Sequence, residues 1–298
     1  INGVDTRWFQ DDASLAMKMV ADKSTNINGV VLPKVESRDD VDYISQNFSS
    51  LWMDGGASAT SSSYLQMPQA ITPSGSIISD KSSSAVPVIS PVPIWAMMET
   101  PRAILSAVDI AGHPSIQGLI LGTNDLSKEL RLRPESNETR EGLSASLQLT
   151  ILAARAHGKP VIDGVYNNFR DEEGFRRECI QGKAWGMDGK SLIHPSQIAI
   201  ANDILAPSSE EIEHARRVLA CWEESGDTGV VVLDGAMIEQ LHVDSAKRIL
   251  EQAEMMQLQT ETYNNPSAIK IMGRITGPLF PLPHALLLQN PIVRTHQN

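Results

Sequence analysis

The sequence predicts an α/β protein built on a parallel sheet, and two observations carry that prediction. Short apolar runs rich in β-branched residues alternate with longer amphipathic stretches along most of the chain. The short runs are largely apolar on both faces, which is typical of parallel strands covered by helices. The number of strand–helix repeats indicates a (β/α)8 barrel. An open doubly wound sheet is the alternative, but no Gly-x-Gly-x-x-Gly follows an early strand.

The individual elements follow from these patterns. We predict strands over residues 29–35, 92–98, 118–122, 159–163, 184–188 and 191–193. Three amphipathic stretches predict helices over residues 11–21, 143–157 and 208–224. The buried faces of the first two are predicted to contain Leu15, Ala16, Met19 and Val20, and Leu147, Ile151, Leu152 and Ala154. In the third, Ser208 is a good N-cap and the acidic residues after it suit a first helical turn.

Two segments break the strand–helix pattern. Residues 57–84 contain ten serines and only two charged side chains, so we predict a surface insertion there. From about residue 257 the helical periodicity fades and five prolines follow, which predicts an irregular tail. The expected organisation is a barrel domain over 1–206 that carries the insertion, a C-terminal helical segment over 207–256, and a proline-rich tail over 257–298.

Composition excludes several classes of protein. With a formal net charge of -11 among 298 residues, the chain is not expected to bind nucleic acid, which requires clustered Lys and Arg. No apolar run approaches the roughly 18 residues of a membrane-spanning helix, so no membrane partner is expected. The two cysteines, Cys179 and Cys221, lie far apart and predict neither a disulfide framework nor a zinc site. They favour a reducing compartment, mitochondrial or cytoplasmic.

Acidic side chains occur where two predicted strands end. Glu99 follows one apolar strand, and Asp125 follows the next strand along the chain. Because parallel strands of a barrel end on one face, these carboxylates are expected to converge there. Two carboxylates without a nearby Cys or His suit Mg²⁺, which prefers oxygen ligands. The alternative is that Glu99 caps a helix starting near Pro101 and that Asp125 only structures a loop.

Seven motifs occur in an order that identifies a family. They are Ile1-Asn2-Gly3, Leu32-Pro33-Lys34-Val35-Glu36, Glu99-Thr100-Pro101-Arg102, Gly122-Thr123-Asn124-Asp125-Leu126, Ile162-Asp163-Gly164-Val165-Tyr166, Asp188-Gly189-Lys190-Ser191-Leu192-Ile193-His194-Pro195-Ser196-Gln197 and Gly235-Ala236-Met237-Ile238-Glu239. On these motifs the chain resembles the HpcH/HpaI aldolase and citrate lyase beta-subunit superfamily, within its citramalyl-CoA/malyl-CoA lyase-like branch. The resemblance covers roughly residues 1–56 and 85–256.

The resemblance implies a (β/α)8 barrel in a trimer or hexamer that binds Mg²⁺ and a CoA thioester. Glu99 and Asp125 match the family's metal ligands, and Ile193 and His194 match a segment that contacts CoA. Glu239 matches an acidic position that reaches a neighbouring subunit's site, where it is the candidate catalytic carboxylate. For His194 a structural role before Pro195, and for Glu239 a solvated position at a helix start, are the alternatives.

The implied reaction is cleavage of a 3-hydroxyacyl-CoA into acetyl-CoA and a 2-oxo acid, or the reverse condensation. A malyl-CoA-type thioester hydrolase on the same site and a catalytically impaired CoA-binding protein are the alternatives. Family members begin with a strand and helix ahead of the present Ile1 and place an arginine directly before the Ile1-Asn2 pair. We therefore expect a barrel that is incomplete at its N-terminus, and we do not assign the role of that arginine to Arg7 or Arg102.

Overall fold

The chain forms two compact units in a computed structural model. The model describes residues 1–4, 6–22, 29–54, 88–133, 140–226, 229–264 and 285–287. The first unit is formed by Ile1–Gln197 with Leu286–Asn298, and the second by Ile198–Ala285. The predicted serine-rich insertion over 57–84 lies outside the described residues, as does most of the predicted tail.

The first unit alternates strands and helices along the chain, as predicted. Its elements are α1 (Phe9–Ala21), β1 (Val30–Leu32), α2 (Arg38–Asp54), β2 (Ile94–Met98), α3 (Pro101–Leu105), α4 (Ala107–Ala111), β3 (Ile116–Leu121), α5 (Thr123–Glu129), η4 (Glu141–Leu143), α6 (Ser144–Ala156), β4 (Val161–Asp163), α7 (Glu172–Trp185) and β5 (Gly189–Leu192). Helix α8 (Ser196–Leu205) begins at the end of this unit.

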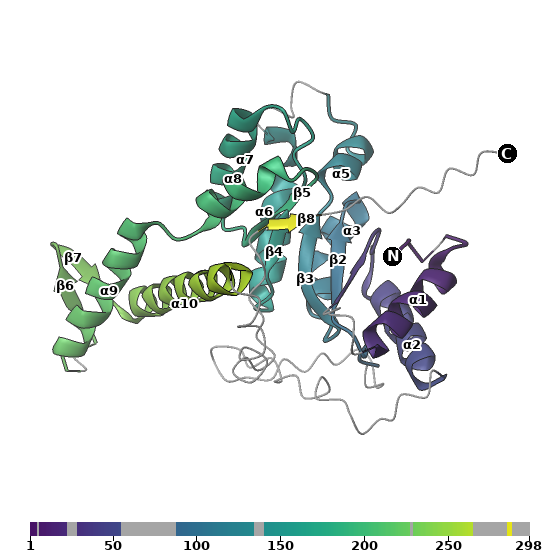
Figure 1. The fold of residues 1–298 in the computed structure, drawn as a ribbon, viewed down its shortest axis with the longest axis horizontal. Helices are drawn as coiled ribbons and strands as arrows, with labels where there is room; N and C mark the ends of the chain where they lie inside the picture. Colours follow the sequence, from purple (N-terminus) through teal and green to yellow (C-terminus); the bar gives the residue numbers. More distant parts are fainter. Residues whose placement is uncertain are drawn as a thin grey trace. The chain divides into compact units, whose positions relative to one another are not determined.

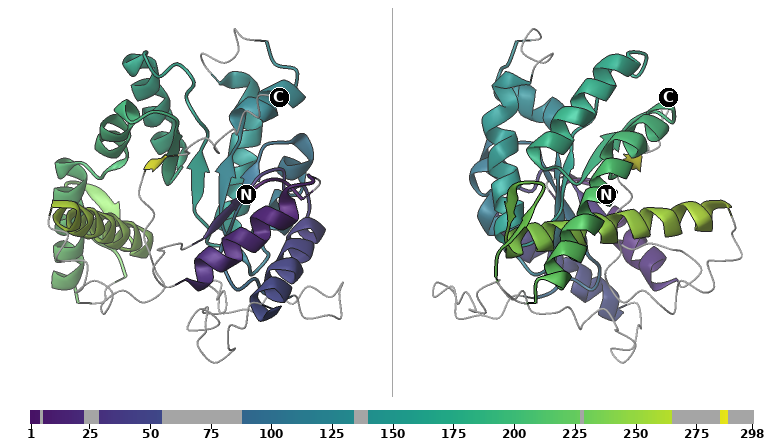
Figure 2. Two further views of the ribbon diagram at one scale, coloured as in Figure 1. Left: turned by 45° about the vertical axis from the view of Figure 1, so that its right-hand side comes forward. Right: turned by 90° about the vertical axis from the view of Figure 1, so that its left-hand side faces the viewer.

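The strands of the first unit form one parallel sheet in chain order. Strand β1 pairs with β2, β2 with β3, β3 with β4 and β4 with β5, all in parallel. A short strand, β8 (Ala285–Leu287), follows β5 in the sheet order. Figure 1 shows these strands side by side, and Figure 2 shows the sheet and helices α1 and α2 from two further directions. The described residues thus confirm a curled parallel α/β sheet; closure into eight strands and the missing N-terminal elements stay predictions.

The two faces of the sheet differ in what covers them. One face contributes Ile94, Ala96 and Leu119 to a single core that also contains residues of α1, α2, α4 and α6. The register places Trp95 beside Gly118 and Met97 beside Ile120 on the opposite, inner face. The outer face packs against these helices, whereas on the inner face Trp95 and Met97 are half-buried and Ile120 and Ile162 are fully buried.

The second unit is helical with one hairpin. Helix α9 (Ser209–Glu224) starts as predicted: Ser208 Oγ accepts a hydrogen bond from Glu211 N at 3.1 Å, and the Glu211 carboxylate accepts one from Ser208 N. Strands β6 (Val231–Leu233) and β7 (Ala236–Ile238) form an antiparallel hairpin, and α10 (Gln240–Asn264) follows. Helices α9 and α10 share a small apolar core with the hairpin, through Val218, Ile238 and Val243 among others.

Two details of the sequence prediction are wrong. The predicted strand over 184–188 is instead the end of α7, which Gly186 terminates in the left-handed conformation at φ 96°, and the strand begins only at Gly189. A five-residue apolar run cannot distinguish a buried helix end from a strand. The predicted buried faces of α1 and α6 are partly wrong as well, because Leu15, Met19 and Leu152 are exposed.

Candidate functional site

Glu99 stands at the carboxyl end of β2, on the inner face of the sheet. It follows Met98 directly, and its main chain leads into α3. The helix cap is supplied by Thr100, whose hydroxyl accepts a hydrogen bond from Ala103 N at 3.1 Å, and Pro101 occupies the first turn. Glu99 is therefore not the cap of this helix, and its carboxylate is available for another role.

The Glu99 side chain is buried and tightly enclosed. Its exposed fraction is 4%, and Glu99 Oε1 accepts a hydrogen bond from Lys34 N at 2.8 Å. Lys34 directs this N–H from a left-handed backbone conformation at φ 52°, which is uncommon for a residue other than glycine. Gly122 lies against the carboxylate, since a Cβ at that position would come within 2.8 Å of Glu99 Oε2. The chain thus reserves space for this carboxylate.

Asp125 approaches Glu99 from the neighbouring strand. It lies in the first turn of α5, which begins directly after β3, and its side chain is exposed. Burial raises the pKa of Glu99, and the charge of Asp125 raises it further, against the lowering effects of Lys34. The structure therefore brings the two predicted metal ligands within electrostatic reach of each other, at the carboxyl ends of adjacent strands.

This pair fits a hard divalent cation. A buried carboxylate whose ionised form is disfavoured by burial and by a second carboxylate gains stability when a cation is bound between them. Within the described ranges no group of three or more His, Cys, Asp and Glu side chains could hold a metal ion. Two carboxylates alone leave coordination positions to water and substrate, as is usual for Mg²⁺ and unusual for zinc.

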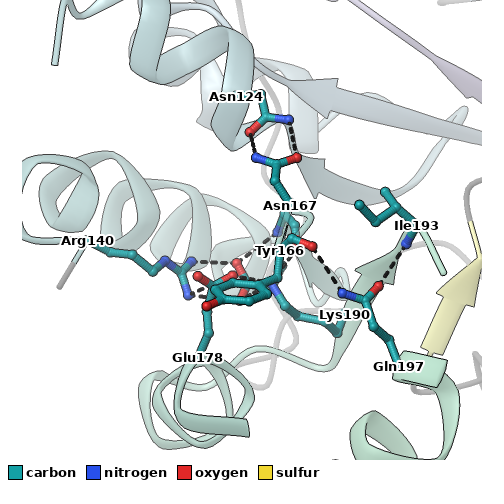
Figure 3. A network of polar contacts seen from close by, with 10 residues as sticks. Asn124, Arg140, Tyr166, Asn167, Glu178, Lys190, Ile193 and Gln197 are labelled. Atoms are coloured by element: carbon teal, nitrogen blue, oxygen red, sulfur yellow. Dashed lines mark hydrogen bonds and ion pairs between the residues drawn. The ribbon is translucent and has the colours of Figure 1, made fainter. Parts of the chain in front are cut away.

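Ile193 and His194, the predicted CoA-contacting residues, follow β5 at the same end of the sheet. Their backbone N–H groups both donate to Gln197 Oε1, at 3.0 and 3.3 Å, and Gln197 Nε2 donates to the Tyr166 carbonyl oxygen (Figure 3). Ile193 is 39% exposed. The His194 ring stacks on Phe169 with centroids 4.6 Å apart, so it presents a flat aromatic surface that the sequence alone did not indicate.

A buried ion cluster supports the strand ends from the outer face. Asp163 accepts hydrogen bonds from Arg140 at 2.5 and 3.0 Å and from Lys190 at 3.2 Å, and Lys190 also donates to Glu178 at 2.5 Å (Figure 3). Burial alone would raise the pKa of Asp163, but Lys190 and Arg140 outweigh it and keep that pKa below its usual value. Burial likewise raises the pKa of the nearby Cys179 thiol to about 12, so this cysteine stays protonated at neutral pH.

A cavity of about 970 Å³ opens beside this cluster. Its lining includes Arg140, Glu178, Tyr166 and the amide pair Asn124–Asn167. The two amides exchange hydrogen bonds of 3.0 and 2.6 Å and so join the start of α5 to the loop after β4 (Figure 3).

Comparison of the sequence with known protein families identifies the family of the chain. A sequence model of the HpcH/HpaI aldolase/citrate lyase family matches residues 1–195, which is well over half of the chain. The chain belongs to this family. The family predicted from the motifs is thereby confirmed. The matched residues contain the first five motifs and most of the sixth, whereas the motif over 235–239 lies beyond them.

Several characterised family members are similar to the chain. A (3S)-malyl-CoA thioesterase of Cereibacter sphaeroides strain ATCC 17025 is 39% identical over 85% of the chain and 73% of its own length. The same enzyme of strain KD131 is 50% identical over 56% of the chain and 59% of its own length. The citrate lyase beta subunit of Escherichia coli K12 is 37% identical over 56% of each protein.

Solved structures show the same fold at lower identity. A citrate lyase from Burkholderia xenovorans LB400 has a TM-score of 0.67 with 18% identity, and covers 86% of the chain and 72% of its own. The CitE protein from Mycobacterium tuberculosis, solved with magnesium, acetoacetate and coenzyme A, has a TM-score of 0.57 with 24% identity, and covers 85% and 76%. At this identity the likeness concerns the family fold alone.

Glu239, the predicted catalytic carboxylate, lies in the second unit, between β7 and α10. Its backbone N–H donates to His242 Nδ1 at 3.0 Å, and its side chain is exposed. This position is compatible with both alternatives of the sequence analysis: a solvated carboxylate at a helix start, and an acidic group that reaches the site of a neighbouring subunit.

Proposed function

We propose that the chain is a Mg²⁺-dependent enzyme acting on a 3-hydroxyacyl-CoA thioester of the malyl-CoA type. The observation that carries the proposal is the buried Glu99 carboxylate within electrostatic reach of Asp125, because a bound cation would compensate the charges of both carboxylates. The flat His194–Phe169 surface at the end of β5 is suited to an extended cofactor portion such as CoA. The relatives that are 39–50% identical are named malyl-CoA thioesterases, which supports a malyl group as the acyl part of the substrate.

Each part of the site has a distinct task. A bound Mg²⁺ supplies positive charge to the oxygens of the substrate as negative charge develops on them. Glu99 and Asp125 hold that charge in place, and Lys34 fixes the orientation of Glu99 through its backbone N–H. The strand ends stay rigid because the Asp163 cluster is buried and paired on the outer face. With Cys179 protonated, no thiolate is provided here for covalent catalysis.

Two reactions on this substrate use the same site. In hydrolysis, water attacks the thioester carbon, the carbon–sulfur bond breaks, and the sulfur leaves as a thiol after gaining a proton, which yields malate and CoA. In carbon–carbon cleavage, the hydroxyl loses a proton, its oxygen becomes the carbonyl of glyoxylate, and the electron pair of the broken bond passes to the thioester enolate. Protonation of that enolate gives acetyl-CoA.

The similarity to two malyl-CoA thioesterases favours hydrolysis, whereas the similarity to a citrate lyase subunit favours the cleavage predicted from sequence. Product analysis separates them. Incubation of the chain with malyl-CoA and Mg²⁺ should release either free CoA with malate or acetyl-CoA with glyoxylate. Binding of both ligands without any product would instead identify a catalytically impaired CoA-binding protein.

Substitutions at the carboxylates test the metal assignment. Glu99→Gln and Asp125→Asn should each lower turnover at least about a hundredfold, because one ligand of the cation is lost. Asp109→Asn is the matched control, since Asp109 is also exposed in the first turn of a short helix but precedes β3. Wild-type turnover in either carboxylate variant would refute the assignment.

We also propose that the chain forms a homo-oligomer of eight-stranded barrels. In it, Glu239 acts as the catalytic carboxylate at the site of a neighbouring copy. The exposed position of Glu239 supports this, as does its location in a unit separate from Glu99. Mixing two inactive variants, Glu239→Gln and Glu99→Gln, should restore part of the activity, because some mixed interfaces then carry both intact groups. No recovery after dissociation and reassembly of the mixture would contradict a shared site.

A further inference from the structure

The loop after β4 is anchored to α7 and to the start of α8. The Tyr166 carbonyl oxygen accepts a hydrogen bond at 3.0 Å from Nε2 of Gln197, whose exposed fraction is 1% (Figure 3). The Tyr166 hydroxyl donates to Asp171 Oδ2 at 2.7 Å, and the Tyr166 ring lies against Phe175 with centroids 6.0 Å apart. Asn167, the residue after Tyr166, therefore stands on an anchored stretch of backbone.

The first turn of α5 depends on tertiary contacts for its position. The helix spans only seven residues, Thr123–Glu129, and Gly122 at its N-cap has no side chain to cap it. A helix this short is marginal on its own in water. Asp125, the candidate metal ligand, lies in this turn, so the place of its carboxylate follows from what the neighbouring residues contact.

Two contacts join this turn to the chain at the end of β4. The Thr123 side chain is buried against Gly164, where an added Cβ would come within 2.6 Å of Thr123 Cγ2. The exposed side chains of Asn124 and Asn167 exchange two hydrogen bonds, of 3.0 and 2.6 Å, although these residues are 43 positions apart. Two reciprocal, directional hydrogen bonds specify one orientation of the turn. They do so at the residue directly before Asp125.

We propose that Asn167 is a positioning residue for the candidate metal site: through Asn124 it holds the first turn of α5 where Asp125 can share a cation with Glu99. The inference rests on the proposed function, in which Asp125 is a metal ligand. Glu99 is already fixed, because it is buried and accepts a hydrogen bond from Lys34 N at 2.8 Å. The exposed Asp125 carboxylate accepts no hydrogen bond from the residues that the structure describes. Its position is therefore set by the turn that carries it.

Calorimetric titration of the full chain with Mg²⁺ tests the proposal. Asn167→Ala and Asn124→Ala should each bind Mg²⁺ roughly three- to tenfold more weakly than wild type, the range expected from the loss of neutral hydrogen bonds. Because both substitutions break the same pair, the double variant should bind no more weakly than the weaker single variant. Asn168→Ala is the matched control: Asn168 is the next exposed amide of the loop, its side chain has no hydrogen-bond partner among the described residues, and its removal should leave Mg²⁺ affinity unchanged.

Binding of free CoA separates positioning from a general loss of structure in the loop. The loop also holds Gln197, whose Oε1 accepts hydrogen bonds from the N–H groups of Ile193 and His194 at 3.0 and 3.3 Å. Collapse of the loop would therefore weaken the binding of CoA as well as that of Mg²⁺. Loss of the exposed amide pair alone should leave the CoA affinity and the unfolding temperature close to those of wild type, because water replaces its hydrogen bonds.

The outcomes distinguish this inference from the proposed function. Equal Mg²⁺ affinity of wild type, Asn124→Ala and Asn167→Ala, with weaker binding by Asp125→Asn, would overturn the inference and leave the proposed function intact. A parallel loss of CoA and Mg²⁺ affinity in Asn167→Ala, or the same loss of Mg²⁺ affinity in Asn168→Ala, would overturn the inference as well. Failure of the wild-type chain to bind Mg²⁺ or CoA would overturn both.

Discussion

The contact between Gly122 and Glu99 gives the sharpest test of the candidate metal site. In Gly122→Ala the new methyl group would lie 2.8 Å from Glu99 Oε2 and closer still to Glu99 Cβ, whereas nonbonded carbon atoms prefer roughly 3.5–4.0 Å. Glu99 cannot retreat freely, because its other oxygen is held by Lys34 N at 2.8 Å. We expect the carboxylate to be displaced, with a loss of about 1–3 kcal/mol of stability from overpacking.

Displacement of one carboxylate should weaken Mg²⁺ binding by at least about tenfold, since second-sphere disturbances alone reach that size. The measurement is calorimetric titration of Mg²⁺, together with thermal unfolding of the same preparation. Gly118→Ala is the matched control: Gly118 lies on β3, which Gly122 directly follows, and its Cβ would clash as closely with the Trp95 ring, away from Glu99. Both variants should lose stability, but only Gly122→Ala should lose the metal. Wild-type Mg²⁺ affinity in Gly122→Ala would refute the reasoning.

Three further predictions concern charge and capping. Burial and the charge of Asp125 raise the pKa of Glu99, so protons compete with Mg²⁺ for this carboxylate. The affinity of the protein for Mg²⁺ should therefore fall by up to about tenfold per pH unit below that pKa, as measured by Mg²⁺ titrations at stepwise lower pH. Asp163→Asn leaves two buried cations under-compensated and should lower the free energy of unfolding by about 3–5 kcal/mol in denaturant titrations. Because the folded pKa of Asp163 is depressed, its contribution is present above the unfolded pKa and is lost on acidification, so the difference between wild type and variant should shrink at low pH. Ser208→Ala removes a capping box and should cost about 1 kcal/mol of stability, measured by urea unfolding; no loss would contradict the cap geometry.

Much of the fold could be predicted because local pattern and global structure agree. The runs that became β1 to β4 are largely apolar on both faces, and their ends lie within three residues of the predicted ends. The start of α9 was predicted to the residue, because the Ser208 cap is a local interaction that needs no tertiary partner. The strand predicted over 184–188 failed because Trp185 is a helical residue whose burial comes from tertiary packing, which periodicity in a short run cannot reveal.

The candidate site was predictable in part. Topology alone predicts that Glu99 and Asp125 stand at the carboxyl ends of adjacent parallel strands, and the structure places them there; their role as metal ligands stays a prediction. The choice between a helix cap and a free carboxylate needed the structure, where the Thr100 hydroxyl forms the cap. The His194–Phe169 stack joins residues that are distant in sequence, and no local pattern indicated it.

The sequence by itself determined the alternation of strands and helices, the family motifs and the acidic residues at strand ends, since each depends on neighbours along the chain. Only the tertiary structure decided that Glu99 is buried against Gly122, that Asp163 is paired with Arg140 and Lys190, and that Asn124 is paired with Asn167. The physical reason is that burial and hydrogen-bond satisfaction depend on strand register and on which face is covered. Both are set when distant segments pack together.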